Sequence, residues 1–396
     1  YRRRLPERFG LFRPRRDLDV PAIWVHAVSV GEALAAAPLV ESLLRDYPAH
    51  RIVLTTTTPT GSERIRALFG HRVFHVYAPW DLPGPLRRFL RRTRPRLALL
   101  METELWPNLV HYCGVAGCPV LLLNARLSAR SARGYARLPG LTRSLLQGLH
   151  TVACQTSTDS ERFLALGLSP TAAVVTGNIK FDLELAPELR ARARSLHQVF
   201  AGEGRPVLVA ASTHAGEEAL ILAAYREVRH SLGACLLVLV PRHPERFDEV
   251  FSLCRQQGWE VLRRSAGTDP TAADDILLGD TMGELLLLLG TATVAIFGGS
   301  LAGHGGHNVL EAAAWGVPVI SGPHMENFAE ISRQLCAAGG MRQLESPAGL
   351  TAGLLELLGD PEQRQRMGAA GMDVVARNRG AGARLQGLLA RQLAGG

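Results

Sequence analysis

Short runs of β-branched and leucine residues alternate with helix-length segments through most of this chain, and the alternation occurs in two series. This pattern is typical of βαβ units, in which parallel strands are joined by helices that cover both faces of a sheet. The first series predicts strands at residues 23–28, 52–57, 73–76, 97–101, 120–123, 151–153 and 173–175. The second series predicts strands at residues 206–211, 236–240, 260–262, 276–278, 294–297 and 317–321. We therefore expect an α/β protein built on two parallel sheets.

A charged segment without strand character, between residues 183 and 204, separates the two series. A length of 396 residues is enough for two domains that each bury a full core. We predict two doubly wound, Rossmann-like domains that face each other across a cleft, over residues 1–185 and 186–396. Domains of this kind bind ligands at the carboxyl ends of their strands, and candidate site residues are expected there.

Charge and cysteine content bear on the cellular setting. The chain carries 44 Lys and Arg against 36 Asp and Glu, a formal net charge of +8, and its single lysine is Lys180. Its six cysteines lie mostly in apolar runs, which argues against a secreted disulfide framework and favours a reducing, cytoplasmic compartment. No stretch approaches the roughly 20 uninterrupted apolar residues of a membrane-spanning helix.

Arginines cluster in two places. They are Arg2, Arg3, Arg4, Arg8, Arg13, Arg15 and Arg16 at the amino end, and Arg87, Arg88, Arg91, Arg92, Arg94 and Arg96 in and after a predicted helix. Both clusters are compatible with a solvated face or with contact to an anionic membrane surface. Nucleic acid fits less well, because few aromatic residues interleave with the arginines and no recognition motif accompanies them.

Three carboxylates follow buried strands of the first series. Glu32 stands in the first turn of an alanine-rich helix, directly after Gly31, where the helix dipole favours a negative charge. Glu102 and Glu104 follow the strand at 97–101, and residues two apart on an extended strand end share a face. Such carboxylates can act as general bases or tune a neighbouring acid or base, although helix-start glutamates without a catalytic role have the same pattern.

The second series carries features of a phosphate site. Ser212, His214 and Glu217 stand in the helix-start sequence STHAGEE, and the bare amino end of a helix binds anions. Arg242 lies in the sequence PRHPERF, where the flanking prolines stiffen the loop and the guanidinium can clamp a phosphate or carboxylate.

The segment FGGSLAGHGGHNVLE, from residue 297 to residue 311, combines a strand, a glycine loop and a helix start. Backbone N–H groups in such a loop can cradle a phosphate, and Glu311 is placed to accept hydrogen bonds from ribose hydroxyls. The spacing is neither GxGxxG nor a P-loop. His304 and His307 have no third metal ligand nearby in the sequence, so we expect a nucleotide-sugar site here and no metal.

Lys180 lies in GNIKFD, after the last strand of the first series. In a chain that uses arginine everywhere else, the one lysine offers a compact point charge that the arginine fork does not.

The ordered motifs SVGE, TTTTPTG, ETELWPN, NARLS, QTSTDSERFLALG, GNIKFD, STHAGEE, PRHPERF, GDTMGEL, FGGSLAGHGGHNVLE and GPHMENF closely resemble those of the 3-deoxy-D-manno-octulosonic acid (Kdo) transferases of Gram-negative bacteria. The resemblance extends from about Tyr1 to beyond Phe328. It implies a two-domain GT-B glycosyltransferase that moves Kdo from CMP-Kdo to a hydroxyl group of a lipid A precursor (lipid IVA) in lipopolysaccharide core biosynthesis. It also implies inversion at the anomeric carbon, without an obligatory metal or other cofactor.

The resemblance implies roles for particular residues. It places the general base at Glu32 and a second catalytic carboxylate at Glu104. It places contacts to the CMP donor at Lys180, Ser212, His214, Glu217, Arg242, Met282, Gly283, Glu284, Asn308 and Glu311. Ala312 stands where the family commonly has a proline after the glutamate, so the helix start there is expected to differ slightly.

The resemblance also implies a location at the cytoplasmic face of the bacterial inner membrane. Members of the family usually begin with a hydrophobic anchor, and the Tyr-Arg-Arg-Arg start resembles the segment that follows it. We therefore expect an anchor upstream of Tyr1 and a peripheral contact with anionic lipid.

Two other functions remain compatible with these residues. One is a different nucleotide-sugar enzyme on the same fold, such as a UDP-sugar transferase or an epimerase, which would bind UDP in place of CMP. The other is a non-catalytic, anionic-lipid-binding protein on a glycosyltransferase scaffold, which would transfer no sugar.

Overall fold

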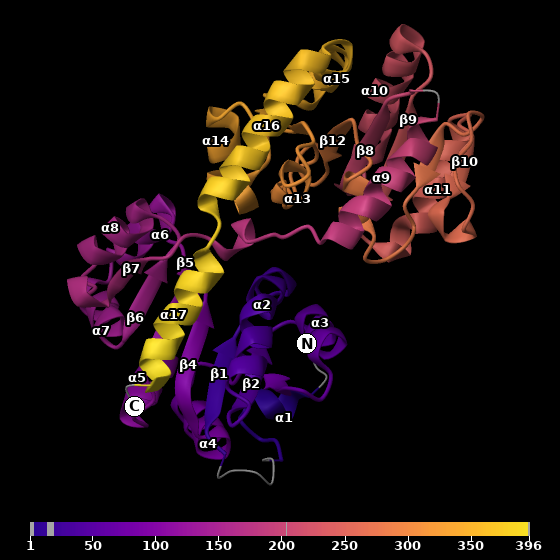
Figure 1. The fold of residues 1–396 in the computed structure, drawn as a ribbon. Helices are drawn as coiled ribbons and strands as arrows, with labels where there is room; N and C mark the ends of the chain where they lie inside the picture. Colours follow the sequence, from indigo (N-terminus) through magenta and orange to yellow (C-terminus); the bar gives the residue numbers. More distant parts are fainter. Residues whose placement is uncertain (1–3, 14–19, 203, 395–396) are drawn as a thin grey trace. The chain divides into compact units, whose positions relative to one another are not determined.

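The computed structural model describes residues 4–13, 20–202 and 204–394. Contacts separate the chain into two compact units. Unit 1 comprises Tyr1–Asp182 and Asn378–Gly396, and unit 2 comprises Leu183–Arg377 (Figure 1).

Unit 1 is built on a seven-stranded parallel sheet in the order β3-β2-β1-β4-β5-β6-β7. Its strands are β1 (Ala22–His26), β2 (Arg51–Thr56), β3 (Phe74–Tyr77), β4 (Pro95–Met101), β5 (Val120–Ala125), β6 (Thr151–Cys154) and β7 (Ala173–Val175). The strand order reverses between β1 and β4, and doubly wound sheets bind their ligands at the carboxyl end of such a switch point.

Helices cover both faces of this sheet. They are α1 (Leu5–Arg8), α2 (Val30–Asp46), α3 (Pro59–Phe69), α4 (Pro83–Thr93), α5 (Pro107–Val115), α6 (Ala129–Tyr135), α7 (Pro139–Gln147), α8 (Ser157–Ala165) and α17 (Ala381–Ala394). Successive residues of β1 point to opposite faces, so Trp24 joins one apolar cluster and Ile23 the other. Hydroxyl caps from Ser29 and Thr156 start α2 and α8 by accepting backbone N–H groups of the first turn.

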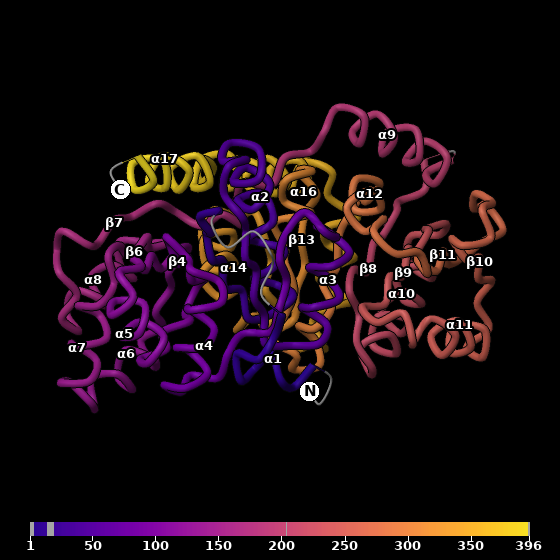
Figure 2. The backbone as a smooth tube through the Cα atoms, turned by 90° about the horizontal axis from the view of Figure 1, so that it is seen from below, coloured from indigo at the N-terminus to yellow at the C-terminus, as the bar shows by residue number. Residues whose placement is uncertain are grey.

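The C-terminal helix α17 belongs to unit 1. Its residues Leu385, Leu388 and Leu389 are buried in the same cluster as Val25 and Leu54, and it lies beside α2 in Figures 1 and 2. The Asp182 carboxylate accepts hydrogen bonds from the backbone N–H groups at the start of this helix. The chain therefore returns to its first unit after completing the second.

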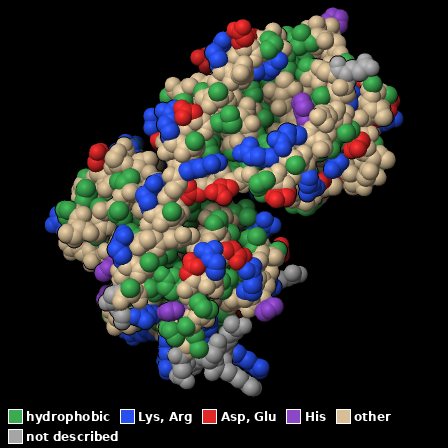
Figure 3. Space-filling model, viewed as in Figure 1, with side chains coloured by type: hydrophobic (Ala, Val, Ile, Leu, Met, Phe, Trp, Pro, Cys, Tyr) green, Lys and Arg blue, Asp and Glu red, His purple; other side chains and the backbone are tan. Residues whose placement is uncertain are grey.

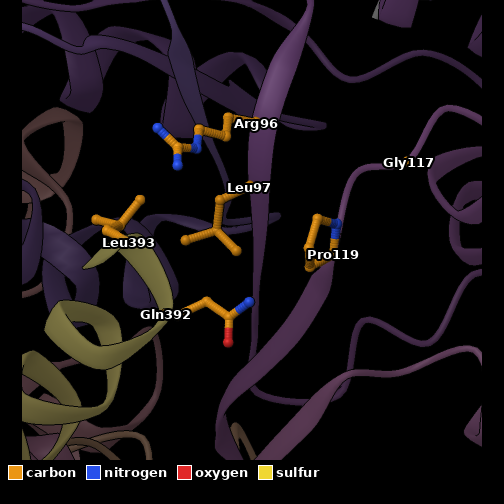
Figure 4. Close-up of a pocket in the computed structure, with 6 residues that line it drawn as sticks. All are labelled: Arg96, Leu97, Gly117, Pro119, Gln392 and Leu393. Atoms are coloured by element: carbon orange, nitrogen blue, oxygen red, sulfur yellow. The ribbon is translucent and has the colours of Figure 1, made fainter. Parts of the chain in front are cut away.

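A cavity of about 190 Å³ lies between α17 and the amino-terminal ends of β4 and β5 (Figure 4). It is lined by Arg96, Leu97, Gly117, Pro119, Gln392 and Leu393. It lies at the opposite end of these strands from the carboxylates discussed below, so it forms no part of their site.

Unit 2 is built on a second seven-stranded parallel sheet, in the order β10-β11-β9-β8-β12-β13-β14. Its strands are β8 (Val207–Thr213), β9 (Leu236–Pro241), β10 (Val261–Arg263), β11 (Ile276–Leu278), β12 (Val294–Phe297), β13 (Val319–Ser321) and β14 (Met341–Gln343). Its helices are α9 (Pro187–Ala201), α10 (Glu217–Leu232), α11 (Phe247–Gln256), α12 (Leu285–Leu289), α13 (Leu310–Ala313), α14 (Ala329–Ala337), α15 (Leu350–Gly359) and α16 (Pro361–Asn378).

The glycine loop after β12 needs its glycines. A Cβ at Gly298 would stand 2.4 Å from the backbone oxygen of Ser212, and Gly299 adopts a φ of 70°. A side chain at either position would push β8 and β12 apart at their carboxyl ends or strain the turn.

The predicted α/β class and two parallel sheets are confirmed, and each of the 13 predicted strands has a counterpart in the structure. The structure adds β14, which the sequence did not predict. It also differs from the predicted division of the chain, because the segment from Asn378 onward packs in unit 1 and residues 186–396 therefore do not form a single domain. Within the part of the chain that the structure describes, no helix is both long and apolar enough to cross a membrane.

Candidate functional site

Glu32 lies at the amino end of α2, just beyond the carboxyl end of β1. The backbone N–H of Val28 donates to its Oε2 at 2.8 Å, and the Ser29 hydroxyl donates to its Oε1 at 3.0 Å. Burial raises the pKa of this carboxyl to about 7, helped by the negative charges of Glu104 and Glu102, while the Val28 hydrogen bond opposes the shift. A fixed carboxylate that titrates near neutrality is suited to accept a proton from a hydroxyl group.

Glu104 lies after β4, where the indole Nε1 of Trp106 donates to its Oε2 at 2.8 Å. Burial raises the pKa of the Glu104 carboxyl, and the charge of Glu102 adds to that shift. The pKa of the Tyr135 phenol is raised by burial and by the charge of Glu104, which places the end of α6 near this carboxylate.

Glu102 makes the strongest ionic contacts of this edge. Its side chain is 6% exposed, its Oε1 lies 2.7 Å from Lys180 Nζ, and its Oε2 lies 3.1 Å from Arg126 Nε. The residue adopts a positive φ of 55°, so the chain turns sharply as it leaves β4. The structure thus places Lys180 in unit 1 with the carboxylates, whereas the residues predicted to contact CMP otherwise lie in unit 2.

Asn124 positions that lysine. Its Oδ1 accepts from the backbone N–H of Ile179 at 3.1 Å, and Asn178 Oδ1 accepts from the backbone N–H of Lys180 at 3.0 Å. Asn124 also has a positive φ of 53°, a conformation that asparagine tolerates better than most residues. The two asparagines hold the short turn from which Lys180 reaches Glu102.

In unit 2, Glu217 joins the start of α10 to the glycine loop. Its Oε2 accepts from the backbone N–H groups of His214 and Gly299, at 2.9 and 2.7 Å. Its Oε1 accepts from the backbone N–H groups of Leu301 and Ala302, at 2.8 and 3.1 Å. The residue is 0% exposed, and both of its oxygens are occupied by backbone N–H groups.

Four histidines meet beside this loop. The His214 ring stacks on those of His304 and His307, with centroids 4.3 and 5.1 Å apart, and lies edge-on to His243 at 5.2 Å. His214 Nε2 and His307 Nε2 are 2.8 Å apart, so one of these nitrogens donates a hydrogen bond to the other. The accepting nitrogen carries no proton, and its ring is therefore neutral. Burial, followed by the charge of Arg242, lowers the pKa of His307 to about 3. Among the described residues, no group of three or more His, Cys, Asp or Glu side chains is arranged to hold a metal ion.

Arg242 and Ser212 flank the histidines. Ser212 has a positive φ of 57° and is 6% exposed, and the exposed Arg242 follows β9 with its backbone N–H bonded to Thr213. Among the residues that the structure describes, the Arg242 guanidinium makes no ion pair. A charged donor next to a glycine loop suits a phosphate group.

Asn308 and Glu311 lie at the start of α13. Asn308 Nδ2 donates to Glu311 Oε1 at 3.4 Å, and burial raises the pKa of the Glu311 carboxyl. The buried Oδ1 of Asn308 has no hydrogen-bond partner among the described residues. The unpaired amide oxygen of Asn308 and the neighbouring carboxylate of Glu311 are two acceptors that suit a pair of ribose hydroxyls.

Met282, Gly283 and Glu284 form the loop between β11 and α12. Met282 is 71% exposed, and Gly283 has open space where a Cβ would be. Burial opposes ionisation of Glu284, but hydrogen bonds from Thr281 and Arg264 lower the pKa of its carboxyl. Glu284 is therefore already bonded to Thr281 of its own loop and to Arg264 after β10, while Met282 is exposed and able to contact a ligand.

Several site residues were missed by reasoning from the sequence alone. The sequence pattern does not indicate that Glu102 pairs with Lys180 and Arg126. It also does not indicate that Tyr135 lies near Glu104 or that His243 contacts His214. The rarity of Lys180 was the available signal for Glu102, because a lone lysine needs an acidic partner when it is partly buried.

Comparison with known proteins finds relatives that cover most of this chain. Residues 3–183 match the family model described as "3-Deoxy-D-manno-octulosonic-acid transferase (kdotransferase)". A 3-deoxy-D-manno-octulosonic acid transferase of Haemophilus influenzae is 43% identical over 390 residues, covering 98% of this chain and 91% of that protein. The corresponding transferase of Bordetella pertussis is 42% identical over 389 residues, covering 95% and 89%.

A solved structure of a UDP-GlcNAc 2-epimerase from Neisseria meningitidis shares the fold, with a TM-score of 0.62 over 93% of this chain and all (100%) of that one. At 14% identity this likeness concerns the fold alone. The two long sequence matches decide the family: the chain belongs to the 3-deoxy-D-manno-octulosonic acid transferases.

Proposed function

We propose that this glycosyltransferase moves Kdo from CMP-Kdo to a hydroxyl group of a lipid A precursor, with inversion at the anomeric carbon and Glu32 as the general base. The observation that carries the proposal is the state of Glu32: a carboxylate fixed by Val28 and Ser29 whose pKa is raised to about 7 by burial. Such a group is ionised in part at neutral pH and still basic enough to take a proton.

The reaction needs one bond to form and one to break. The acceptor oxygen attacks the anomeric carbon while its proton passes to a carboxylate oxygen of Glu32. The bond between the anomeric carbon and the phosphate oxygen breaks, and CMP leaves with the electron pair. Lys180 and Arg126, both bonded to Glu102, offset the negative charge of that carboxylate, which would lessen its repulsion of the ionised Glu32.

The donor is proposed to bind unit 2. Arg242 would take the phosphate, together with N–H groups of the glycine loop other than those of Gly299, Leu301 and Ala302, which Glu217 occupies. Ser212 and His214 would line the phosphate, and Asn308 with Glu311 would take the ribose. Met282, Gly283 and Glu284 would contact the base or sugar, and Glu217 would hold the loop in place. We propose no metal and no other cofactor, because the reaction requires only a base, a phosphate cradle and cationic donors.

We further propose that unit 1 meets the cytoplasmic face of the inner membrane at the end that carries α4. Leu5, Leu11, Trp80 and Leu82 are exposed there, at 39%, 47%, 39% and 51%. Arg88 and Arg92 bond to the backbone of Phe9 and Gly10 and so tie the amino-terminal segment to α4. Arginine side chains lie around this end of the unit (blue, lower part of Figure 3). Arg2, Arg3, Arg15 and Arg16 of the predicted cluster lie outside the described residues.

The decisive experiment is mass spectrometry of a tetraacyl lipid A precursor incubated with the protein and a CMP-Kdo generating system. We expect a mass increment of one or more Kdo units, and no increment with Glu32→Gln. The matched control is Glu41→Gln, which should retain transfer. Glu41 lies on α2 like Glu32, but it is exposed and pairs with Arg72. A folded wild-type protein that gives no increment beside an active control enzyme would contradict the proposal.

A further inference from the structure

The segment from Ser128 to Leu141, which we name the α6–α7 arm, is unusually exposed for an ordered part of a globular unit. Helix α6 contains no buried residue, and Leu138 and Leu141 beyond it are 61% and 53% exposed. Helices of globular proteins normally bury an apolar stripe. In α6 only Ala132 and Tyr135 pack against the core, and both are only partly buried, so the arm leaves its arginines and the two leucines beyond it open to solvent.

The arm is nevertheless held at both ends. Before it, the backbone of buried Leu127 is bonded on both sides, with its N–H donating to Asp159 at 2.8 Å and its carbonyl accepting from Arg162 at 2.8 Å. After it, the Thr142 hydroxyl donates to the carbonyl of Tyr135 at 2.8 Å. The Ser128 hydroxyl caps α6 by accepting from the N–H of Ser131. The exposure therefore belongs to a defined structure that is fixed to the unit at its two ends.

The arm is strongly basic. Residues 105–158, a run of 54, contain no Asp or Glu, and three of the arginines in this run, Arg130, Arg133 and Arg137, lie in the arm. All three are exposed, and none of their guanidinium groups makes a hydrogen bond or ion pair with another side chain among the described residues. Three unpaired cations within eight residues repel one another and favour an anionic ligand that would neutralise them.

The arm also adjoins the carboxyl end of the unit 1 sheet, where Glu102 and Glu104 lie. Tyr135, the last residue of α6, lies near Glu104 closely enough for the two groups to interact electrostatically. Arg126, two residues before the arm, pairs with Glu102. A molecule that places a hydroxyl group at Glu32 would therefore extend along the arm.

We propose that the α6–α7 arm recognises the acceptor, with Arg130, Arg133 and Arg137 binding its phosphate groups and Leu138 and Leu141 contacting its acyl chains. The proposal rests on the proposed function, because it takes a phosphorylated, acylated lipid as the acceptor. A ligand with both anionic and long apolar parts matches the arm better than a purely anionic or a purely apolar one. Its phosphates would pair with the arginines while its chains cover the leucines.

The first test compares Arg130→Gln/Arg133→Gln/Arg137→Gln with a control of equal charge change, Arg255→Gln/Arg333→Gln/Arg366→Gln, whose three arginines are exposed in unit 2. We expect the arm variant to raise the KM for the acceptor at least tenfold, with CMP affinity and the melting temperature unchanged within error. A KM equal to that of the control would overturn the proposal.

The second test uses the acceptor with its phosphates removed. The wild type should lose affinity for this analogue, whereas the arm variant should bind the phosphorylated and dephosphorylated forms alike. If both proteins lose the same factor on dephosphorylation, the arginines do not read the phosphates. Leu138→Ser/Leu141→Ser should weaken binding of the acylated acceptor but not of a deacylated, water-soluble analogue, with Leu232→Ser as the exposed control.

Direct binding separates failure of this inference from failure of the proposed function. Detergent micelles that carry the acceptor lipid should retain the wild type and not the arm variant, whether or not sugar transfer occurs. Equal retention of the wild type by phosphatidylglycerol micelles without acceptor would assign the arm to general anionic lipid and overturn the specific role. Transfer by the wild type with unchanged retention of the arm variant would overturn this inference alone.

Discussion

Lys180 Nζ lies 2.7 Å from Glu102 Oε1, so the chain's one lysine is paired with the buried carboxylate that follows β4 in unit 1. The two residues are 78 positions apart in the sequence and meet because β4 and β7 end at the same edge of the sheet. Arg126 supplies a second, longer contact at 3.1 Å. This pair fixes the end of β4 relative to the turn after β7.

Replacing Lys180 should leave the buried Glu102 carboxylate with Arg126 as its remaining ion-pair partner among the described residues. We expect Lys180→Met to lower the free energy of unfolding by about 1–3 kcal/mol. In a double-mutant cycle with Glu102→Gln, measured by urea unfolding, the double variant should lose less than the sum of the single variants. Strict additivity would contradict a direct pairing of the two side chains.

Much of the fold could be predicted from the sequence because buried parallel strands are continuous apolar runs. Strands such as Ile276–Leu278 and Val294–Phe297 were found with these bounds. The edge strand β14 (Met341–Gln343) could not be predicted because it is three residues long and two of them are polar. The packing of α17 in unit 1 could not be predicted either. The sequence of an amphipathic helix shows which of its faces is apolar, but not which core that face joins.

The site was predictable at the level of strand ends and not at the level of contacts. Spacing of two placed Glu102 and Glu104 on one face, but the positive φ of Glu102 ends the strand geometry on which that argument depends. As a result, Glu102 reaches Lys180 while Glu104 reaches Trp106. Similarly, the position of Glu217 at a helix start does not indicate that its carboxylate accepts hydrogen bonds from a loop 82 to 85 residues away.

The raised pKa of Glu32 predicts the pH dependence of turnover. A general base acts when it is ionised, so kcat/KM should fall about tenfold for each pH unit below the pKa of about 7 and level off above it. The measurement is transfer rate from pH 5.5 to 9, with CMP affinity followed in parallel as the control. A rate that stays constant down to pH 5.5 would show that Glu32 is not the base.

The same shift affects stability with a defined sign. The ordinary pKa of a glutamate is 4.5, and that of Glu32 in the folded protein is raised to about 7. The unfolded chain therefore releases this proton first as pH rises, and the contribution of Glu32 to stability is lost between about pH 4.5 and pH 7. Glu32→Gln should raise the melting temperature relative to wild type more at pH 8 than at pH 4.5. An equal effect at both pH values would contradict the shift.

Arg242 should contribute to donor binding through the phosphate. Because its guanidinium is exposed beside the glycine loop, we expect Arg242→Gln to weaken CMP binding by about 1.5–3 kcal/mol, the value of a charge-assisted hydrogen bond. Calorimetry with CMP and with cytidine separates the contributions. The variant should lose affinity for CMP and keep its affinity for cytidine, which has no phosphate, and an equal loss for both ligands would place Arg242 away from the phosphate.

Glu217 should be needed for the shape of the donor loop, since its two oxygens accept four backbone N–H groups at 0% exposure. In Glu217→Gln the new amide nitrogen would face two of those N–H groups and leave them without an acceptor. We expect a loss of about 2–4 kcal/mol in the free energy of unfolding, measured by urea unfolding. Glu227→Gln, an exposed change on the same helix, should cost little.

The loss of stability from Glu217→Gln should be accompanied by weaker CMP binding at a temperature where the variant is still folded, because the glycine loop presents its N–H groups only while Glu217 holds it. Saturating CMP should in turn recover part of the lost melting temperature, since a ligand that binds the folded state stabilises it. A folded variant with wild-type CMP affinity would show that the loop keeps its shape without this carboxylate. The loop would then be held by its hydrogen bonds with the segment after β13, among them the one in which the Ser300 hydroxyl accepts from the N–H of Gly322 at 2.7 Å.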